Sequence, residues 1–283
     1  MSVFFFFALA TVVGTLTTLF WIPEDDLGRG YFQMNALIIL GFLSLVLAVV
    51  TLHPFQPFGD SPTTTTAVLW GAFGTAFLYY MAIWRERWLW ARLAAVACLL
   101  SCTIALLVAG HFLIDGAGLV ALHGAVQEPG PLPYRRFLTT LALGSSSLLL
   151  GWSLVAMLLG HWYLVAPRLT FRHLIIFCWV LLATVVLRLL AVGATLVAAA
   201  AVDELVEPNP LRMLVSMEGQ GMFFWFRLLW GLAIPLLLAL MSLHCARQRS
   251  NQSATGILYV LLVGTFIGEI TAYYLAVTTG VPS

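Results

Sequence analysis

Eight long apolar stretches divide this chain, and they constrain its fold more than any other feature. Each runs for about 20 residues or more, the length that a helix needs to cross the hydrocarbon core of a bilayer. Of the 283 residues, 61% are hydrophobic and only 9% are charged, whereas a soluble domain carries about 25% charged residues. The sequence therefore predicts an all-α fold, a polytopic transmembrane helix bundle that forms a single integral membrane domain over residues 1–283. The expected spans are 2–22, 33–52, 65–84, 91–113, 137–161, 173–201, 221–245 and 255–277.

The segments between the spans are rich in residues that favour turns. Examples are "PEDDLGRG", "HPFQPFGDSP" and "QEPGPLP". Long irregular backbone is tolerated only outside the hydrocarbon, so these breaks are expected at the two membrane surfaces. The first apolar stretch lacks a basic n-region and an obvious cleavage site, which favours a first span over a signal peptide.

The arginines predict how the spans are oriented. The loops after the first, third, fifth and seventh spans hold eight arginines, whereas the loops on the opposite side hold three. Arginine-rich loops tend to remain in the cytoplasm. We therefore expect a multi-pass protein of the bacterial cytoplasmic (inner) membrane with both termini outside. The eight are Arg29, Arg85, Arg87, Arg92, Arg168, Arg172, Arg247 and Arg249, and the three are Arg135, Arg136 and Arg212.

Three ionisable residues lie well inside spans: Arg188, Arg227 and Glu269. Such residues usually face the bundle interior and pair with one another. Arg227 lies roughly 9 Å and Glu269 roughly 12 Å from the same outer surface, at 1.5 Å per helical residue. These two are on consecutive spans, so the sequence predicts an Arg227–Glu269 pair, with Arg188 nearer the midplane. The pair is either glue between helices or a polar site in the outer half of the membrane.

The six histidines lie at helix ends or in loops, three on each side. His53 with His111, and His161 with His244, could formally ligate two b haems, although such ligands usually lie deeper in the bilayer. We therefore do not favour haem b, and no metal site is expected. His111 has Asp115 one turn later on the same helix face. This pair is a candidate proton acceptor, since histidine titrates near neutral pH.

Aromatic side chains surround Arg227 in "FFWFRLLW". Phe224, Trp225 and Trp230 could flank a flat ring, although such a cluster is more often lipid or core packing. Pro235 follows on the same span and is expected to kink it. One turn after Glu269 stands Tyr273, a further candidate for binding a cofactor.

Other functions find no support in the sequence. The net charge of +1 and the absence of a basic tail give no sign of nucleic-acid binding. Four scattered cysteines are too few for a disulfide framework. No Walker, C-x-x-C or G-x-G-x-x-G motif is present.

The last apolar stretch, "GILYVLLVGTFIGEITAYYL", spans residues 256–275 and contains Gly268 and Glu269. It resembles the final helix of the polytopic anchor subunits of DMSO-reductase-type and NrfD-type respiratory complexes, which often carry a Gly-Glu pair in such a setting. The size, the eight spans and the expected outward termini also agree with the DMSO-reductase anchor. The arginine expected a few residues after the glutamate is replaced here by Ala272 and Tyr273.

The resemblance implies a membrane anchor subunit of a respiratory electron-transfer complex that binds quinol or quinone in the outer half of the bilayer. It also implies a hetero-oligomer in which extrinsic iron–sulfur or haem subunits dock on the outer face. Glu269, with His111 and Asp115, would then take up protons. Arg227 would hold Glu269 ionised or bind a quinone oxygen, and Arg188, Trp225 and Tyr273 would complete the site.

Three alternatives remain at this point. The chain could be a b-type cytochrome that uses the histidines at the membrane rim. It could be a secondary transporter or a lipid-processing enzyme, although the inner half of the spans offers few polar residues. It could also be a purely structural anchor in which the buried charges hold the bundle together.

Overall fold

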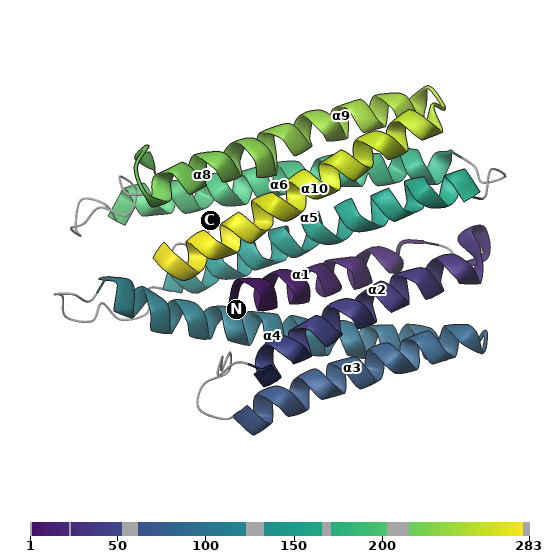
Figure 1. The fold of residues 1–283 in the computed structure, drawn as a ribbon, viewed down its shortest axis with the longest axis horizontal. Helices are drawn as coiled ribbons and strands as arrows, with labels where there is room; N and C mark the ends of the chain where they lie inside the picture. The colour runs from purple at the N-terminus through teal and green to yellow at the C-terminus, as the bar shows by residue number, and fades with distance from the viewer. Residues whose placement is uncertain are drawn as a thin grey trace.

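The computed structural model of the chain describes residues 2–22, 24–52, 62–122, 133–165, 171–202 and 215–279. Within these ranges the chain forms helices and no strand, and eight spans are long and apolar enough to cross a membrane. The expected all-α polytopic bundle is therefore confirmed (Figure 1). Its helices are α1 (Ser2–Leu19), α2 (Glu24–Leu52), α3 (Pro62–Trp84), α4 (Trp88–Leu122), α5 (Pro133–Val165), α6 (Arg172–Val202), α8 (Gln220–Leu228), η1 (Leu229–Ala233), α9 (Ile234–Arg247) and α10 (Asn251–Thr279).

Several helices extend beyond the spans expected from hydropathy. Helix α4 continues to Leu122 instead of ending near residue 113, and α5 begins at Pro133 instead of residue 137. Helix α2 begins at Glu24, but Gly28 interrupts its helical backbone with a φ of 74°. A helix can continue past the apolar segment because its backbone hydrogen bonds are internal and do not depend on the surrounding solvent.

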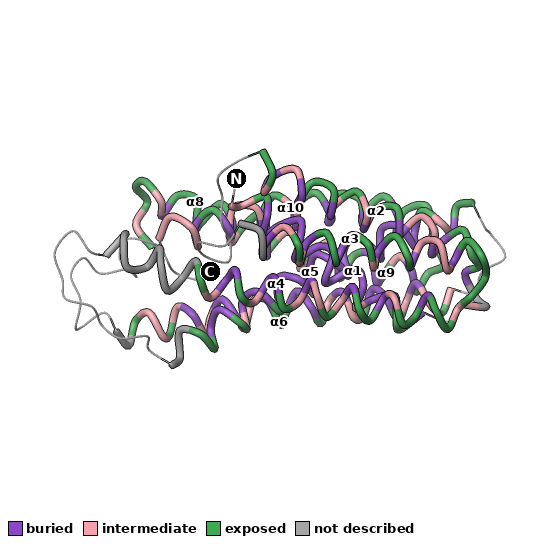
Figure 2. The backbone as a smooth tube through the Cα atoms, turned by 90° about the horizontal axis from the view of Figure 1, so that it is seen from below, coloured by how far each residue is buried: buried purple, intermediate pink, exposed green. Residues whose placement is uncertain are grey.

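Helices α1 and α5 form the centre of the bundle. In their apolar windows 78% and 83% of the residues are buried, against 56% or less in the other spans. Figure 2 shows this buried backbone running through the middle of the molecule. The two helices approach closely because Gly14 of α1 meets Ser147 and Gly151 of α5, where any added Cβ would collide with backbone atoms. Small residues at such crossings bring membrane helices into direct backbone contact.

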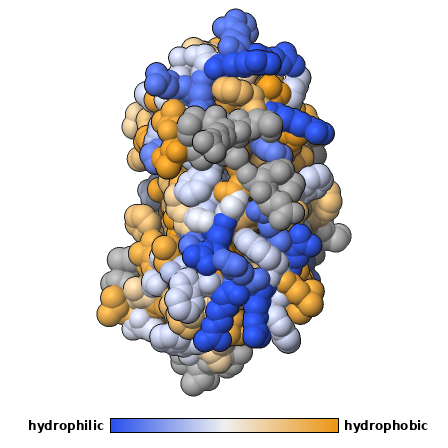
Figure 3. All heavy atoms as spheres, turned by 90° about the vertical axis from the view of Figure 1, so that its right-hand side faces the viewer, coloured by the Kyte–Doolittle hydropathy of each residue, from blue (hydrophilic) through white to orange (hydrophobic). Residues whose placement is uncertain are grey.

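The helix ends that border the connections after the odd-numbered spans lie together at one end of the bundle. Figure 3 views this end, on the right in Figure 1, and shows hydrophilic side chains gathered over it. Two ion pairs lie here, Arg29–Glu86 at 2.9 Å and Arg92–Glu24 at 2.6 Å. The described arginines of these loops thus share one face of the molecule, as the alternation of the spans requires. We call this face the arginine-rich end.

The seventh span consists of three segments in one continuous rod. Helix α8 passes into a five-residue π-helix, η1, and then into α9, with Pro235 in the first turn of α9. The irregularity expected around Pro235 therefore takes the form of a π-helical turn just before the proline. π-Helical turns are rare in proteins, but those that occur are often found at functional sites.

Candidate functional site: a buried charge cluster

Glu269 of α10 is paired with Arg188 of α6. Arg188 Nε donates to Glu269 Oε1 at 3.0 Å, and Arg188 Nη2 donates to Oε2 at 2.8 Å. Both side chains are buried, with exposed fractions of 2% and 1%. Two parallel N–H···O bonds between a guanidinium and a carboxylate form the strongest type of ion pair found in proteins. This contact fixes α6 against α10 in the interior of the bundle.

Helix α5 completes the coordination of this pair with a run of serines. The third nitrogen of the Arg188 guanidinium, Nη1, donates to the Ala142 carbonyl at 3.1 Å and to Ser145 Oγ at 3.3 Å. Ser146 Oγ donates to Glu269 Oε2 at 2.6 Å. Every nitrogen of the Arg188 guanidinium therefore donates to an oxygen, and three helices meet at one carboxylate.

Tyr273 extends the network by one step. Its hydroxyl lies 2.8 Å from Ser146 Oγ. Because the single hydroxyl proton of Ser146 is directed to Glu269, Tyr273 is the donor in this second bond. The Tyr273 ring also stacks on Phe6 of α1, with centroids 6.0 Å apart and 20° between the planes. The result is an ordered chain of hydroxyl groups that ends on the Glu269 carboxylate.

Arg227 of α8 lies beside this pair but is not bonded to it. Its Nη2 is 3.8 Å from Glu269 Oε1, which is an ion-pair distance but too long for a hydrogen bond. None of its three side-chain nitrogens has a hydrogen-bond partner among the residues that the structure describes, and the side chain is fully buried. The expected Arg227–Glu269 pair is therefore present as an ion pair, but the closer partner of Glu269 is Arg188. The comparison of helix depths did not identify this contact, because the long Arg188 side chain reaches Glu269 from a third helix.

The charges of this group do not balance. Two guanidinium groups face one carboxylate among the placed residues, and arginine does not lose its proton in proteins. A buried charge without full compensation is costly. Arg227 is thus a buried cation with unused donor capacity next to an anion that is already engaged. We call Arg188, Arg227, Glu269, Ser146 and Tyr273 the buried charge cluster.

Two glycines allow the seventh span to approach α10 at the cluster. Gly231 of η1 meets Gly268 across the interface, and a Cβ on either residue would overlap the other backbone. Gly268 directly precedes Glu269, and Gly231 follows Arg227 by one turn. The Gly-Glu pair of the last helix therefore combines a close helix crossing with the carboxylate that lies next to it.

The aromatic side chains near Arg227 do not together enclose it among the described residues. Phe224 is buried, but Trp225 is 37% and Trp230 is 44% exposed. The Trp225 indole N–H donates to the Val215 carbonyl at 3.1 Å. Periodicity explains the difference, since neighbouring positions on a helix point in different directions and only part of "FFWFRLLW" faces inward.

His111 lies outside the buried charge cluster, in the same half of the bundle, away from the arginine-rich end. Its Nε2 is 3.3 Å from Thr140 Oγ1 of α5. Thr140 precedes Ser146 by six residues, so His111 lies about 9 Å further along the helix axis. The side chain of Asp115 is outside the described residues, and so is the proposed His111–Asp115 pair.

The histidines considered for haem have other partners where they are described. His161 Nδ1 lies 3.2 Å from the Tyr259 hydroxyl, and His244 Nε2 lies 3.0 Å from Gln248 Nε2. His53 is outside the described residues. Within the placed part of the chain, no group of three or more His, Cys, Asp or Glu side chains could hold a metal ion. The four cysteines are free thiols.

Sequence reasoning missed Ser145, Ser146 and Phe6 as parts of the site. A signal for the serines was present, because "GSSS" interrupts an apolar span at residues 144–147. Hydroxyl groups in a span are usually bonded to their own helix backbone, as Ser147 is to Leu143. Nothing in the sequence distinguishes Ser146, which faces Glu269 instead.

In comparisons with known protein families and with curated proteins, nothing matched this chain.

Proposed function

We propose that this chain is the quinol- or quinone-binding membrane subunit of a respiratory electron-transfer complex. The observation that carries the proposal is Arg227, a fully buried guanidinium whose three nitrogens have no hydrogen-bond partner among the described residues. It lies 3.8 Å from a carboxylate. A polar oxygen that enters this space gains donors that the protein has left unused, and a quinone carbonyl or a quinol hydroxyl supplies such an oxygen.

The cluster also meets the proton requirement of this chemistry. Oxidation of a quinol to a quinone releases two protons and two electrons, so proton acceptors must lie near the ring oxygens. Glu269 is a carboxylate at the centre of the cluster, and Ser146 and Tyr273 form a hydroxyl chain that ends on it. In this proposal Arg227 holds a ring oxygen and Arg188 keeps Glu269 in place. Glu269 takes up one proton, and His111 takes up the second further toward the outer face. The electrons pass to an extrinsic redox partner.

The structure around Arg227 supports entry of a ligand from the seventh span. The cluster is closed in this structure, because its side chains are buried. The π-helix begins two residues after Arg227, and π-helical turns occur frequently at functional sites. A shift of α8 and η1 relative to α10 would open the space beside Arg227 without moving Arg188.

The location of the protein belongs to the same proposal. The arginine-rich end faces the cytoplasm of a bacterium by the positive-inside rule. The buried charge cluster then lies in the outer half of the membrane, both termini are outside, and iron–sulfur or haem subunits dock on the outer face to form a hetero-oligomer. His111, with Asp115, lies further toward that face and would carry protons out of the site. In this proposal Trp225 does not contact the quinone, and its hydrogen bond to the Val215 carbonyl holds the residues before α8 in place.

Photolabelling with an azido-quinone tests the proposal on the purified chain. We expect label on peptides around Arg227 and Glu269, and we expect Arg227→Met to reduce it at least tenfold. Arg172→Met is the matched control, because Arg172 is exposed at the arginine-rich end. Equal labelling of the wild type and Arg227→Met would contradict the proposal.

A purely structural role is the second candidate, and the Arg188–Glu269 contact favours it. Every nitrogen of the Arg188 side chain is bonded, so this pair alone can join α5, α6 and α10. The two candidates differ at Arg227, which a structural role does not require. In a structural anchor, Arg227→Met leaves electron transfer in the assembled complex intact.

A further inference from the structure

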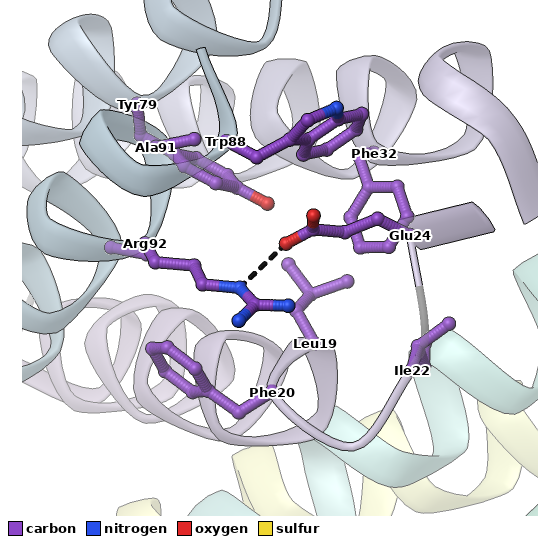
Figure 4. A pocket seen from close by; sticks show the side chains of 10 residues that line it. Leu19, Phe20, Ile22, Glu24, Phe32, Tyr79, Trp88, Ala91 and Arg92 are labelled. Carbon is purple, nitrogen blue, oxygen red and sulfur yellow. Dashed lines mark hydrogen bonds and ion pairs between the residues drawn. The ribbon is translucent and has the colours of Figure 1, made fainter. Parts of the chain in front are cut away.

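A cavity of about 180 Å³ lies at the arginine-rich end, far from the buried charge cluster (Figure 4). The end of α1, the start of α2, the last turns of α3 and the first turns of α4 enclose it. It is large enough for several water molecules or a small polar headgroup. No function considered so far uses it.

Small side chains on α4 create this space. Ala91 and Ala95 are one turn apart on the same face of α4, and both are buried. Aromatic rings form the facing walls. Phe32 and Trp88 contact each other edge to face at 5.5 Å, and Tyr79 is buried beside them. The cavity therefore has aromatic walls on one side and small side chains on the other.

The cavity contains one negative and one positive side chain, and the negative one is more shielded from solvent. Arg92 Nε donates to Glu24 Oε1 at 2.6 Å. The Glu24 side chain is 17% exposed, whereas that of Arg92 is 65% exposed. The carboxylate is thus shielded among the rings, and the guanidinium group lies in the open. Arg92 uses only Nε in this bond, so its two terminal nitrogens remain free to donate within the described structure.

Polar atoms with free bonding capacity face the interior of the cavity. Figure 4 shows the Tyr79 hydroxyl directed toward the Glu24 carboxylate. Among the residues that the structure places, neither that hydroxyl nor the second oxygen of Glu24 has a hydrogen-bond partner. On one side the cavity therefore offers two acceptor oxygens, from Glu24 and Tyr79, next to aromatic rings. On the other side it offers the guanidinium donors of Arg92.

We propose that this cavity binds the headgroup of a zwitterionic aminophospholipid of the phosphatidylethanolamine class. Its ammonium donates to Glu24 and Tyr79 and lies against the rings of Trp88 and Phe32, which attract cations. Its phosphate accepts from the terminal nitrogens of Arg92 in charge-assisted bonds. One positive and one negative group on the ligand match one negative and one positive group on the protein.

The position of the cavity agrees with a lipid headgroup. Glu24 is the first residue of α2 and Arg92 lies one turn into α4, so both charges lie at the end of the bundle. A second ion pair at the same end provides a contrast. Arg29–Glu86 is exposed on both sides, at 44% and 68%, and neither residue lines the cavity.

Native mass spectrometry of the purified chain with added phosphatidylethanolamine or phosphatidylglycerol tests this inference. We expect a one-to-one complex with phosphatidylethanolamine, at an affinity at least tenfold above that for phosphatidylglycerol. Glu24→Gln and Arg92→Met should each weaken it at least tenfold, and Tyr79→Phe several-fold. Glu86→Gln is the matched control and should leave binding unchanged.

A second variant separates loss of the site from loss of folding. Ala91→Leu fills the cavity and keeps both charges, and we expect it to abolish binding while the melting temperature stays within a few degrees of wild type. Equal binding of the two lipids, or equal loss in Glu86→Gln, would overturn the inference. Displacement of the lipid by a quinone at this cavity would also overturn it. None of these results depends on Arg227, so the proposed quinone site stands or fails separately.

Discussion

Arg188 and Glu269 lie on helices α6 and α10 and share two parallel hydrogen bonds of 3.0 and 2.8 Å in the buried interior. Arg227 lies next to the same carboxylate without a hydrogen bond. Arg188 therefore completes a contact between two helices, whereas the hydrogen-bond donors of Arg227 remain available to a ligand. The experiments below use this difference.

Removing the anion of the buried charge cluster should destabilise the fold more than removing all three of its charges. We expect Glu269→Met to lower the free energy of unfolding by about 3–5 kcal/mol, since it leaves two buried guanidinium groups without a carboxylate. The triple variant Arg188→Met/Arg227→Met/Glu269→Met leaves none of these charges and should recover part of this loss. Denaturant titrations of the single variants and the triple variant in detergent measure the coupling. Additive losses would show that the three charges do not act as a unit.

Arg227→Met should leave stability unchanged or raise it. The substitution removes a buried charge that has no hydrogen bond within the described structure, and apolar replacements of poorly paired charges are often neutral or stabilising. Melting temperature in detergent is the measurement, with Arg188→Met as the contrasting variant. A large destabilisation would mean that the 3.8 Å contact with Glu269 holds the fold.

Ser146→Ala should lower the free energy of unfolding more than the same substitution at a typical serine of this bundle. It removes the donor to Glu269 and leaves the hydroxyl of Tyr273 without its acceptor. We expect a loss of about 1–3 kcal/mol in the free energy of unfolding. Ser153→Ala is the control, since Ser153 is equally buried on α5 and bonds to the Leu150 carbonyl of its own helix. Equal losses for both would rule out a special role for Ser146.

Gly268→Ala should separate the seventh span from α10. The new methyl group would overlap the Gly231 backbone, which has no flexible side chain to move aside. We expect a loss of about 1–3 kcal/mol. The matched control is Gly256→Ala on the same helix, where nothing lies within 4 Å of the added carbon. A stable Gly268→Ala protein would show that this crossing adjusts easily.

Cysteine labelling tests the orientation. With Cys245 replaced by serine, Met217→Cys and Gln252→Cys introduce exposed thiols at opposite ends of the bundle. We expect a membrane-impermeant maleimide added to intact cells to label Met217→Cys, and Gln252→Cys only after permeabilisation. The reverse pattern would place the arginine-rich end outside and would contradict the proposed topology.

The sequence by itself determined the class of fold and the positions of the eight spans, because hydrocarbon length and apolar composition act locally along the chain. It also identified Glu269, Arg188 and Arg227 as unusual, because a charge inside a span is costly wherever its partner lies. Only the tertiary structure decided which of them pair. Helix packing brought Arg188 to Glu269, turned Ser146 toward the same carboxylate and left Arg227 without a hydrogen bond among the described residues. The physical reason is that side-chain direction and helix rotation depend on contacts between spans far apart in sequence, such as Gly231 with Gly268.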